Sequence, residues 1–181
     1  MRSIIPYEQN PALRETAREI PIDDIGSTRI QHLIEEMKDL LSNEVYGVAL
    51  AASQLGEPLR LFIVSGKALA RGTRNAKDEP AKADEPATAL PDQVYINPVI
   101  IKTSRGKKDK HEGCLSVRGK WGIVPRAEKM TLRAYNERGE EFTRGASGFL
   151  AHIFQHEMDH LDGILYIDKA KELYDEEPED E

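Results

Sequence analysis

The sequence predicts an α+β fold in which short antiparallel β-sheets pack around a central helix. Two amphipathic helical patterns, one in each half of the chain, flank several short β-like runs. These runs do not alternate regularly with helices, as the strands of a doubly wound sheet would. A hydrophobic share of 39% over 181 residues suits one domain with a substantial core.

The first predicted helix covers residues 27–43, where apolar residues recur at intervals of three and four. The residues on this face are Ile30, Leu33, Ile34, Met37, Leu40 and Leu41. Ser27 or Thr28 supplies the cap at its N-terminus. A segment bounded by glycines, 47–56, follows this helix.

Two β-like runs follow, at residues 59–64 and 94–101. Between them, residues 67–92 are rich in Ala, Lys, Asp, Glu and Pro and repeat the sequence Asp-Glu-Pro-Ala. Such a composition buries little apolar surface, so we expect a mobile insertion there. The insertion would lie within a single domain, residues 1–174.

The second half of the chain predicts a hairpin of strands 129–135 and 141–143, followed by a helix at 147–161. A last helical stretch is expected at 167–173. The remaining residues, 175–181, hold six carboxylates, so without them the net charge of −7 becomes −7 + 6 = −1. Like-charged terminal runs of this kind are usually disordered, and we expect a disordered acidic tail.

Composition also bears on location and partners. No run approaches the roughly 20 apolar residues of a membrane span, and residues 1–9 lack a signal-peptide pattern. We therefore expect a cytoplasmic protein with no membrane partner. The basic stretch 105–110 is interpreted as a solvated hairpin, so no specific nucleic-acid site is expected.

The most informative pattern is His-Glu-x-x-His at residues 156–160. On a helix, positions four apart lie one above the other, so His156 and His160 can bind one metal ion. Glu157 is then placed where a carboxylate can accept a proton from water beside the metal. This pattern predicts metal-assisted hydrolysis.

A catalytic metal site needs a third protein ligand, and the candidates are Cys114, His152 or a distant carboxylate. Eight residues of helix separate His152 from His160 by about 12 Å, which is too far for one ion. His152 is therefore interpreted as lining a cleft. Cys114 is the only cysteine, and its thiol would ionise on a divalent cation and become a strong, soft ligand.

Three segments, 47–54, 112–116 and 155–160, resemble in order and spacing the signature motifs of the peptide deformylase family. Segment 124–129 is also similar to that family. The resemblance runs from the first predicted helix through Asp168.

This resemblance implies an enzyme that removes the formyl group from the N-terminal formylmethionine of newly synthesised polypeptides. It implies that Cys114, His156 and His160 bind the metal. Iron(II) would be the physiological ion, with zinc, nickel or cobalt as substitutes. The partners would be formyl-Met nascent peptides, with the ribosome surface as a further contact.

The same resemblance implies roles for other residues. Glu157 would move the proton, while the Gln54 side-chain amide and the Leu115 backbone N–H would hold the oxyanion. Glu112 would orient a histidine ligand and pair with Arg126.

A formylmethionine substrate also requires an apolar pocket for its side chain. The candidate lining residues are Val48, Ala49, Phe149, His152 and Ile153. Ala49 stands where the family usually has glycine, and Ser53 where it usually has proline or another compact residue. If that glycine takes a positive φ, Ala49 would strain the segment and alter substrate preference.

Two alternatives compete with this interpretation. One is a related amidase or zinc endopeptidase of the His-Glu-x-x-His type that acts on other amides. The other is a non-catalytic protein that keeps a metal for stability. A purely structural site would not need Glu157 or Gln54.

Overall fold

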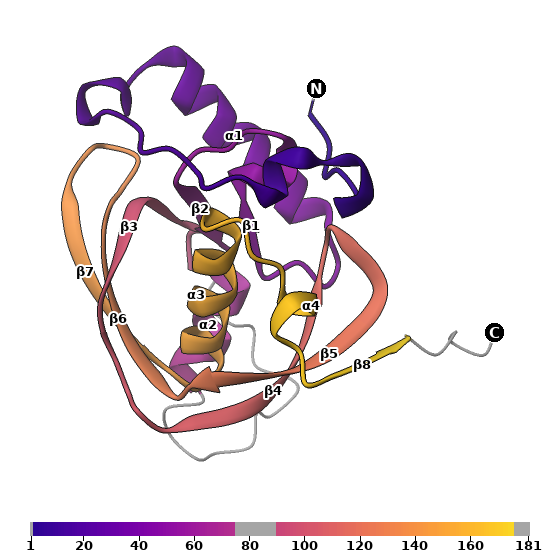
Figure 1. The fold of residues 1–181 in the computed structure, drawn as a ribbon. Helices are drawn as coiled ribbons and strands as arrows, with labels where there is room; N and C mark the ends of the chain where they lie inside the picture. The colour runs from indigo at the N-terminus through magenta and orange to yellow at the C-terminus, as the bar shows by residue number, and fades with distance from the viewer. Residues whose placement is uncertain (1, 75–89, 176–181) are drawn as a thin grey trace.

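Two antiparallel sheets and four α-helices make up the computed structural model, which describes residues 2–74 and 90–175 (Figure 1). The helices are α1 (Thr28–Asn43), α2 (Gly66–Arg74), α3 (Gly148–Leu161) and α4 (Tyr166–Lys169). Short 3₁₀ helices occupy Tyr7–Gln9, Pro11–Arg14, Ile22–Asp24 and Ala52–Leu55. The predicted α+β class with antiparallel sheets is confirmed.

The strands form two separate sheets. The larger sheet has the order β1-β2-β3-β6-β7, with strands Ala49–Ala51, Leu61–Val64, Gln93–Thr103, Lys129–Tyr135 and Glu141–Ser147. The smaller sheet has the order β4-β5-β8, with strands Lys107–Cys114, Val117–Ala127 and Glu172–Asp175. All strand pairs in both sheets are antiparallel.

The side chains of β2 point alternately to the two faces of the larger sheet, and a helix packs against each face. Leu61 and Ile63 pack in the cluster that contains the apolar face of α1. Phe62 and Val64 point the other way, into the cluster that contains α3. All four residues are buried, and a short, wholly apolar strand is the expected result.

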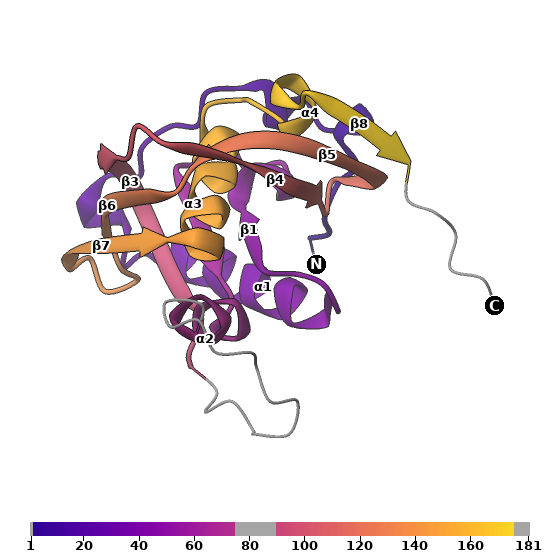
Figure 2. The same cartoon turned by 90° about the horizontal axis from the view of Figure 1, so that it is seen from below.

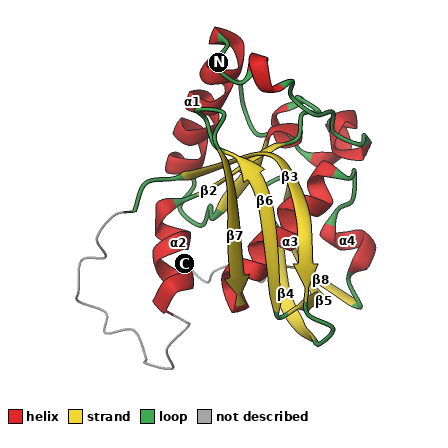
Figure 3. Cartoon of the chain, turned by 90° about the vertical axis from the view of Figure 1, so that its left-hand side faces the viewer, coloured by secondary structure: helices red, strands yellow, loops and turns green. Residues whose placement is uncertain are grey.

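Helix α3 lies between the larger sheet and the smaller one (Figure 2). The helix starts one residue after Ser147 and ends before Gly163, whose φ of +73° suits glycine at a helix terminus. Gln155 joins this helix to β5, because its amide accepts from the Ala127 N–H and donates to the Ala127 carbonyl. Figure 3 shows α3 behind the strands of the larger sheet.

The sequence interpretation of residues 67–92 differs from the structure at its start. Helix α2 occupies Gly66–Arg74, with Ala68 and Leu69 buried in the cluster around α3. Glycine is required at position 66, because a Cβ there would lie 1.6 Å from the Leu90 carbonyl oxygen. Residues 75–89 of the predicted insertion lie outside the described residues.

The structure also differs from the sequence prediction near the C-terminus. Instead of one helix at 167–173, α4 ends at Lys169 and β8 follows. The sequence predicts Asp175 as part of the tail, but in the structure it belongs to β8. It lies opposite Lys120 of β5 in the strand register and forms a 2.8 Å ion pair with that lysine. The rest of the predicted tail, 176–181, lies outside the described residues. Among the described helices, none combines the length and apolar character needed to cross a membrane.

Candidate metal centre

Cys114, His156 and His160 form a cluster whose candidate ligand atoms all lie within 4.8 Å of one another. Cys114 Sγ lies 3.4 Å from His160 Nε2. The two histidine rings come from α3, one turn apart, with their centroids separated by 4.8 Å. The cysteine comes from the end of β4, which lies over the helix (Figure 2).

The tight turn after β4 positions the cysteine. Cys114 pairs directly with Val117 of β5, so only two residues form the connection. Gly113 lies under the ring of Trp121, where a Cβ would come within 3.3 Å of the ring. A side chain larger than hydrogen at position 113 would therefore displace either Trp121 or the cysteine backbone.

The ring nitrogens of the two histidines differ in their surroundings. His156 Nδ1 lies 2.8 Å from Glu112 Oε2, so this nitrogen carries the proton and Nε2 remains for a metal ion. His160 Nδ1 is buried with no hydrogen-bond partner in the described residues. Burial lowers the pKa of His160 well below 6.5, which favours the neutral imidazole that binds metals.

His156 has the opposite shift. Burial alone would lower its pKa, but hydrogen bonds with Cys114 and Glu112 raise the pKa well above 6.5. Without a metal ion, a proton on His156 therefore balances the charge of its neighbours. A divalent cation would take the place of that proton.

Glu157 is buried beside its neighbour His156. Its Oε2 atom has no hydrogen-bond partner in the described part of the chain. Burial raises the pKa of its carboxyl from 4.5 to about 7. A carboxylate with this pKa and a free oxygen can exchange a proton with water near neutral pH.

Gln54 reaches the cluster from the 3₁₀ helix after β1. Its Oε1 accepts from the Ala51 N–H at 2.9 Å, which fixes the orientation of the amide. Its Nε2 therefore faces Cys114 Sγ at 3.6 Å and Ser116 Oγ at 3.3 Å. An N–H donor is held beside the sulfur. Leu115, the other predicted oxyanion donor, lies between Cys114 and Ser116 and is partly buried.

Glu112 and Arg126 form a buried ion pair on the α3 side of the smaller sheet. The Arg126 side chain is 4% exposed and that of Glu112 is 1% exposed. Burial alone would raise the pKa of Glu112, but hydrogen bonds from Arg126, His152 and His156 outweigh it and hold the pKa far below 4.5. Glu112 therefore stays ionised and accepts from His156.

Four of the five predicted pocket residues share one apolar environment around α3, whereas His152 lies against Glu112. Val48 and Phe149 are partly buried and pack against the cluster around α3, and Ile153 is buried within it. The Arg71 guanidinium lies 4.3 Å from the centre of the Phe149 ring. Ala49 is buried in β1 without a positive φ, so its backbone carries no strain of the kind expected from sequence.

His152 lies against Glu112 at 3.0 Å, a contact that was not predicted. Three further residues of the site were missed. Asp159 accepts from Arg126 at 2.6 Å and Lys169 at 2.7 Å, and Ser116 accepts from Gln54. A carboxylate inside an apolar helix pattern was a usable signal for Asp159, whereas nothing local distinguishes Ser116 or Lys169.

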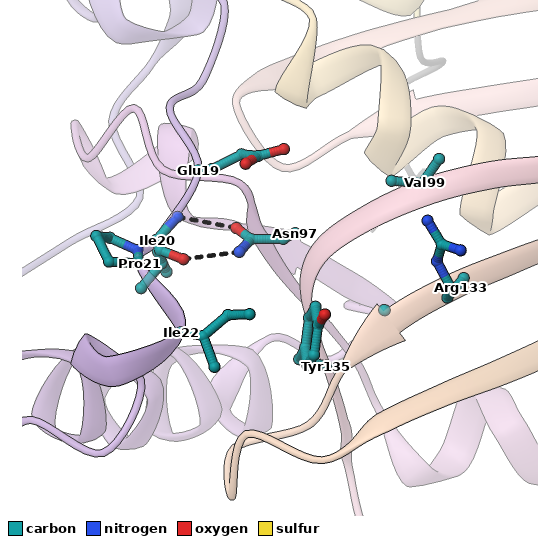
Figure 4. Close-up of a pocket in the computed structure, with 9 residues that line it drawn as sticks. Glu19, Ile20, Pro21, Ile22, Asn97, Val99, Arg133 and Tyr135 are labelled. Carbon is teal, nitrogen blue, oxygen red and sulfur yellow. Dashed lines mark hydrogen bonds between the residues drawn. The ribbon is translucent and has the colours of Figure 1, made fainter.

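A separate pocket of about 370 Å³ lies beside the 3₁₀ segment at Ile22–Asp24 (Figure 4). Asn97 organises it by accepting from the Ile20 N–H and donating to the Ile20 carbonyl. Its φ of +49° is a conformation that asparagine tolerates better than most residues. None of the predicted site residues lines this pocket.

Fold and cluster together define an α+β protein with a candidate metal centre of one cysteine, two histidines one helical turn apart and a buried glutamate. The family model described as polypeptide deformylase matches residues 1–176. The chain therefore belongs to the polypeptide deformylase family, whose members are metallohydrolases that remove formyl groups from N-terminal methionine. The resemblance noted from the three motifs is confirmed.

Individual relatives agree with this assignment. The chain is 36% identical to the peptide deformylase of Desulforudis audaxviator, with 94% of each chain covered. It is 38% identical to the chloroplastic peptide deformylase 1A of Solanum lycopersicum, covering 88% of this chain but 56% of the relative. The chain thus spans little more than half the length of that plant relative.

Solved structures show the same fold. A class I type b peptide deformylase from Acinetobacter baumannii with bound Met-Ala-Ser has a TM-score of 0.75 and 28% identity, covering 93% of this chain and 98% of its own. The peptide deformylase of Thermotoga maritima has a TM-score of 0.74 and 26% identity, covering 95% and 99%.

Proposed function

We propose that this protein is a peptide deformylase, which hydrolyses the formyl amide of N-terminal formylmethionine in newly synthesised polypeptides. The observation that carries the proposal is the cluster of Cys114, His156 and His160 with Glu157 and Gln54 beside it, in a chain of the deformylase family. The proposed catalytic domain is residues 1–174.

The cluster fits a divalent transition metal ion, with Cys114, His156 and His160 as ligands. One thiol and two imidazoles are a borderline-soft donor set, and their candidate ligand atoms lie within 4.8 Å of one another, with His160 Nε2 facing Cys114 Sγ. A bound ion would act as a Lewis acid, polarising the formyl carbonyl and lowering the pKa of water. We propose iron(II) as the physiological ion and zinc, nickel or cobalt as substitutes.

Glu157 is proposed as the proton carrier. Its free Oε2 would accept a proton from the attacking water and then deliver that proton to the departing α-amine. In the protein without a metal ion, burial raises the pKa of this carboxyl to about 7, so both protonation states are accessible near neutral pH. Helix α3 would thus carry both the histidine ligands and the proton carrier.

Gln54 is proposed to stabilise the oxyanion that forms on the formyl oxygen. The amide is oriented before substrate binds, because its oxygen is held by the Ala51 N–H. A donor held in place in this way contributes about 3 kcal/mol to transition-state stabilisation. The Leu115 backbone N–H is proposed as the second donor.

The methionine side chain of the substrate is proposed to lie against Val48, Ala49, Phe149 and Ile153. Support comes from their apolar character and from the Acinetobacter baumannii structure with bound Met-Ala-Ser. Formylated nascent chains are the proposed partners. A contact with the ribosome surface is proposed as well, and ribosome cosedimentation of the purified protein tests it.

The decisive test is formate release from formyl-Met-Ala-Ser by protein loaded with iron(II) under anaerobic conditions. We expect turnover with this peptide and none with unformylated Met-Ala-Ser. Cleavage of unformylated peptides without formate release would instead indicate an endopeptidase. A full metal complement with no turnover of any formylated peptide would indicate a structural metal site.

A further inference from the structure

Four side-chain nitrogen atoms from three residues lie within 3.0 Å of the Glu112 carboxylate oxygens. Arg126 donates to Oε1 through Nε at 2.5 Å and to Oε2 through Nη2 at 3.0 Å. His156 Nδ1 donates to Oε2 at 2.8 Å, and His152 Nε2 lies 3.0 Å from Oε1. An ionised carboxylate offers about four lone-pair positions, so four donors at these nitrogen atoms would use its full capacity.

The donors approach Glu112 from two different elements. Arg126 comes from β5, and both histidines come from α3, which lies beneath that strand (Figure 2). Oε1 and Oε2 each have one donor from the strand and one from the helix. The carboxylate is therefore held from both sides.

Arg126 alone would not give this arrangement. Its Nη1 donates to Asp159, and Asp159 also accepts from Lys169. The guanidinium is therefore shared between two carboxylates. If His152 were absent, Oε1 would have a donor only on the strand side. The carboxylate could then rotate toward Arg126 and away from the His156 ring.

We propose that His152 is a positioning residue, which donates through Nε2 to Glu112 Oε1 and so fixes the carboxylate that orients the metal ligand His156. His152 lies one helical turn before His156, and its side chain is 15% exposed. Residues that orient a ligand through an intermediate carboxylate commonly influence metal affinity. This inference rests on the proposed metal centre of the deformylase.

Co(II) binding to the purified full-length protein tests the proposal, with the dissociation constant measured by chelator competition and the ligand field by the visible absorption spectrum. We expect His152→Leu to weaken Co(II) binding about tenfold and to alter the spectrum. His152→Gln should restore the wild-type constant, because the glutamine amide nitrogen can occupy the position of Nε2. His152→Asn should weaken binding as leucine does, because its shorter amide cannot reach Oε1.

His32→Leu is the matched control. His32 is an exposed histidine of α1 that lies 3.7 Å from Glu36, so this variant removes a histidine–glutamate contact far from the centre. Unchanged Co(II) affinity in both His152→Leu and His152→Asn would overturn the proposal, even if both variants melted at lower temperature. Equal weakening in His152→Gln would overturn it too, since the donor would then not matter.

Formate release by the wild-type protein is measured alongside. A wild-type protein that binds Co(II) but releases no formate would refute the proposed function and leave the Co(II) comparison to decide the role of His152. A wild-type enzyme that is active while the variants bind metal normally would refute the role of His152 alone.

Discussion

Arg126 donates to both oxygens of Glu112, through Nε to one and through Nη2 to the other, in a pair that is almost completely buried. The two residues come from neighbouring strands and face the helix of the histidine ligands. A buried pair of this kind contributes little stability relative to an apolar pair of the same shape, but removing one member leaves an uncompensated charge.

We expect Arg126→Leu to lower the free energy of unfolding by about 3–5 kcal/mol, because Glu112 and Asp159 would both lose their buried partner. Urea denaturation measures this change. Arg126→Lys is the control, because it keeps the positive charge but loses the planar guanidinium. Its free energy of unfolding should fall between those of the wild type and Arg126→Leu. A fully stable Arg126→Leu protein would show that the two histidines compensate Glu112 and that Lys169 compensates Asp159.

Glu157→Gln should reduce formate release roughly 10²–10⁴-fold while the metal content stays unchanged. The amide keeps the size of the side chain but cannot accept the proton of the attacking water. Turnover assays and metal analysis on the same preparation give both quantities. An unaltered rate would remove Glu157 from the mechanism.

Gln54→Leu should lower kcat by roughly 10²–10³-fold with a small change in KM, because the donor acts on charge that develops only in the transition state. Steady-state kinetics with formyl-Met-Ala-Ser separates the two constants. Ser116→Ala serves as the control, because it removes a hydrogen-bond partner of Gln54 but leaves the hydrogen bond from the Ala51 N–H to Gln54 Oε1 in place. A loss confined to KM would assign Gln54 to ground-state binding.

Removal of the metal with a chelator should lower the melting temperature, and added zinc or iron(II) should restore it. An ion that binds only the folded state stabilises it by about 2.7 kcal/mol at a free concentration of 100 Kd. Cys114→Ser should show a much smaller difference between the two conditions. Identical melting of chelated and metal-loaded wild-type protein would argue against binding at this cluster.

The ion pair between Arg14 and Asp168 predicts an acid-dependent contribution to stability. The hydrogen bond from Arg14 lowers the pKa of Asp168 below 3.8, and its contribution is therefore present above pH 3.8 and lost as the pH falls through the lowered pKa. Asp168→Asn should cost less than about 1 kcal/mol at pH 7, because the pair is partly exposed.

Urea denaturation of the wild type and Asp168→Asn between pH 7 and pH 3 checks this expectation. The asparagine oxygen can still accept from the Leu165 N–H, so the comparison isolates the charge. The difference between the two proteins should shrink toward zero at the acidic end. A difference that grows on acidification would contradict the assigned pKa direction.

Local patterns were sufficient for several elements. The three- and four-residue spacing of apolar side chains predicted α1 to within one residue, with Ser27 accepting from the Ile30 N–H as its cap. The same spacing predicted α3. The start of segment 67–92 is helical where the composition predicts a mobile insertion, because Ala68 and Leu69 are buried in a cluster with α3, a contact that the local sequence does not indicate.

The sequence by itself determined that His156 and His160 share one face of a helix, because a separation of four residues fixes that geometry locally. Through the order and spacing of its motifs it also identified the family. Only the tertiary structure decided that Cys114 lies beside His160 and that His152 turns to Glu112. These contacts join β4 to α3 across more than thirty residues of chain, and they depend on how the smaller sheet packs over the helix, which no local pattern records.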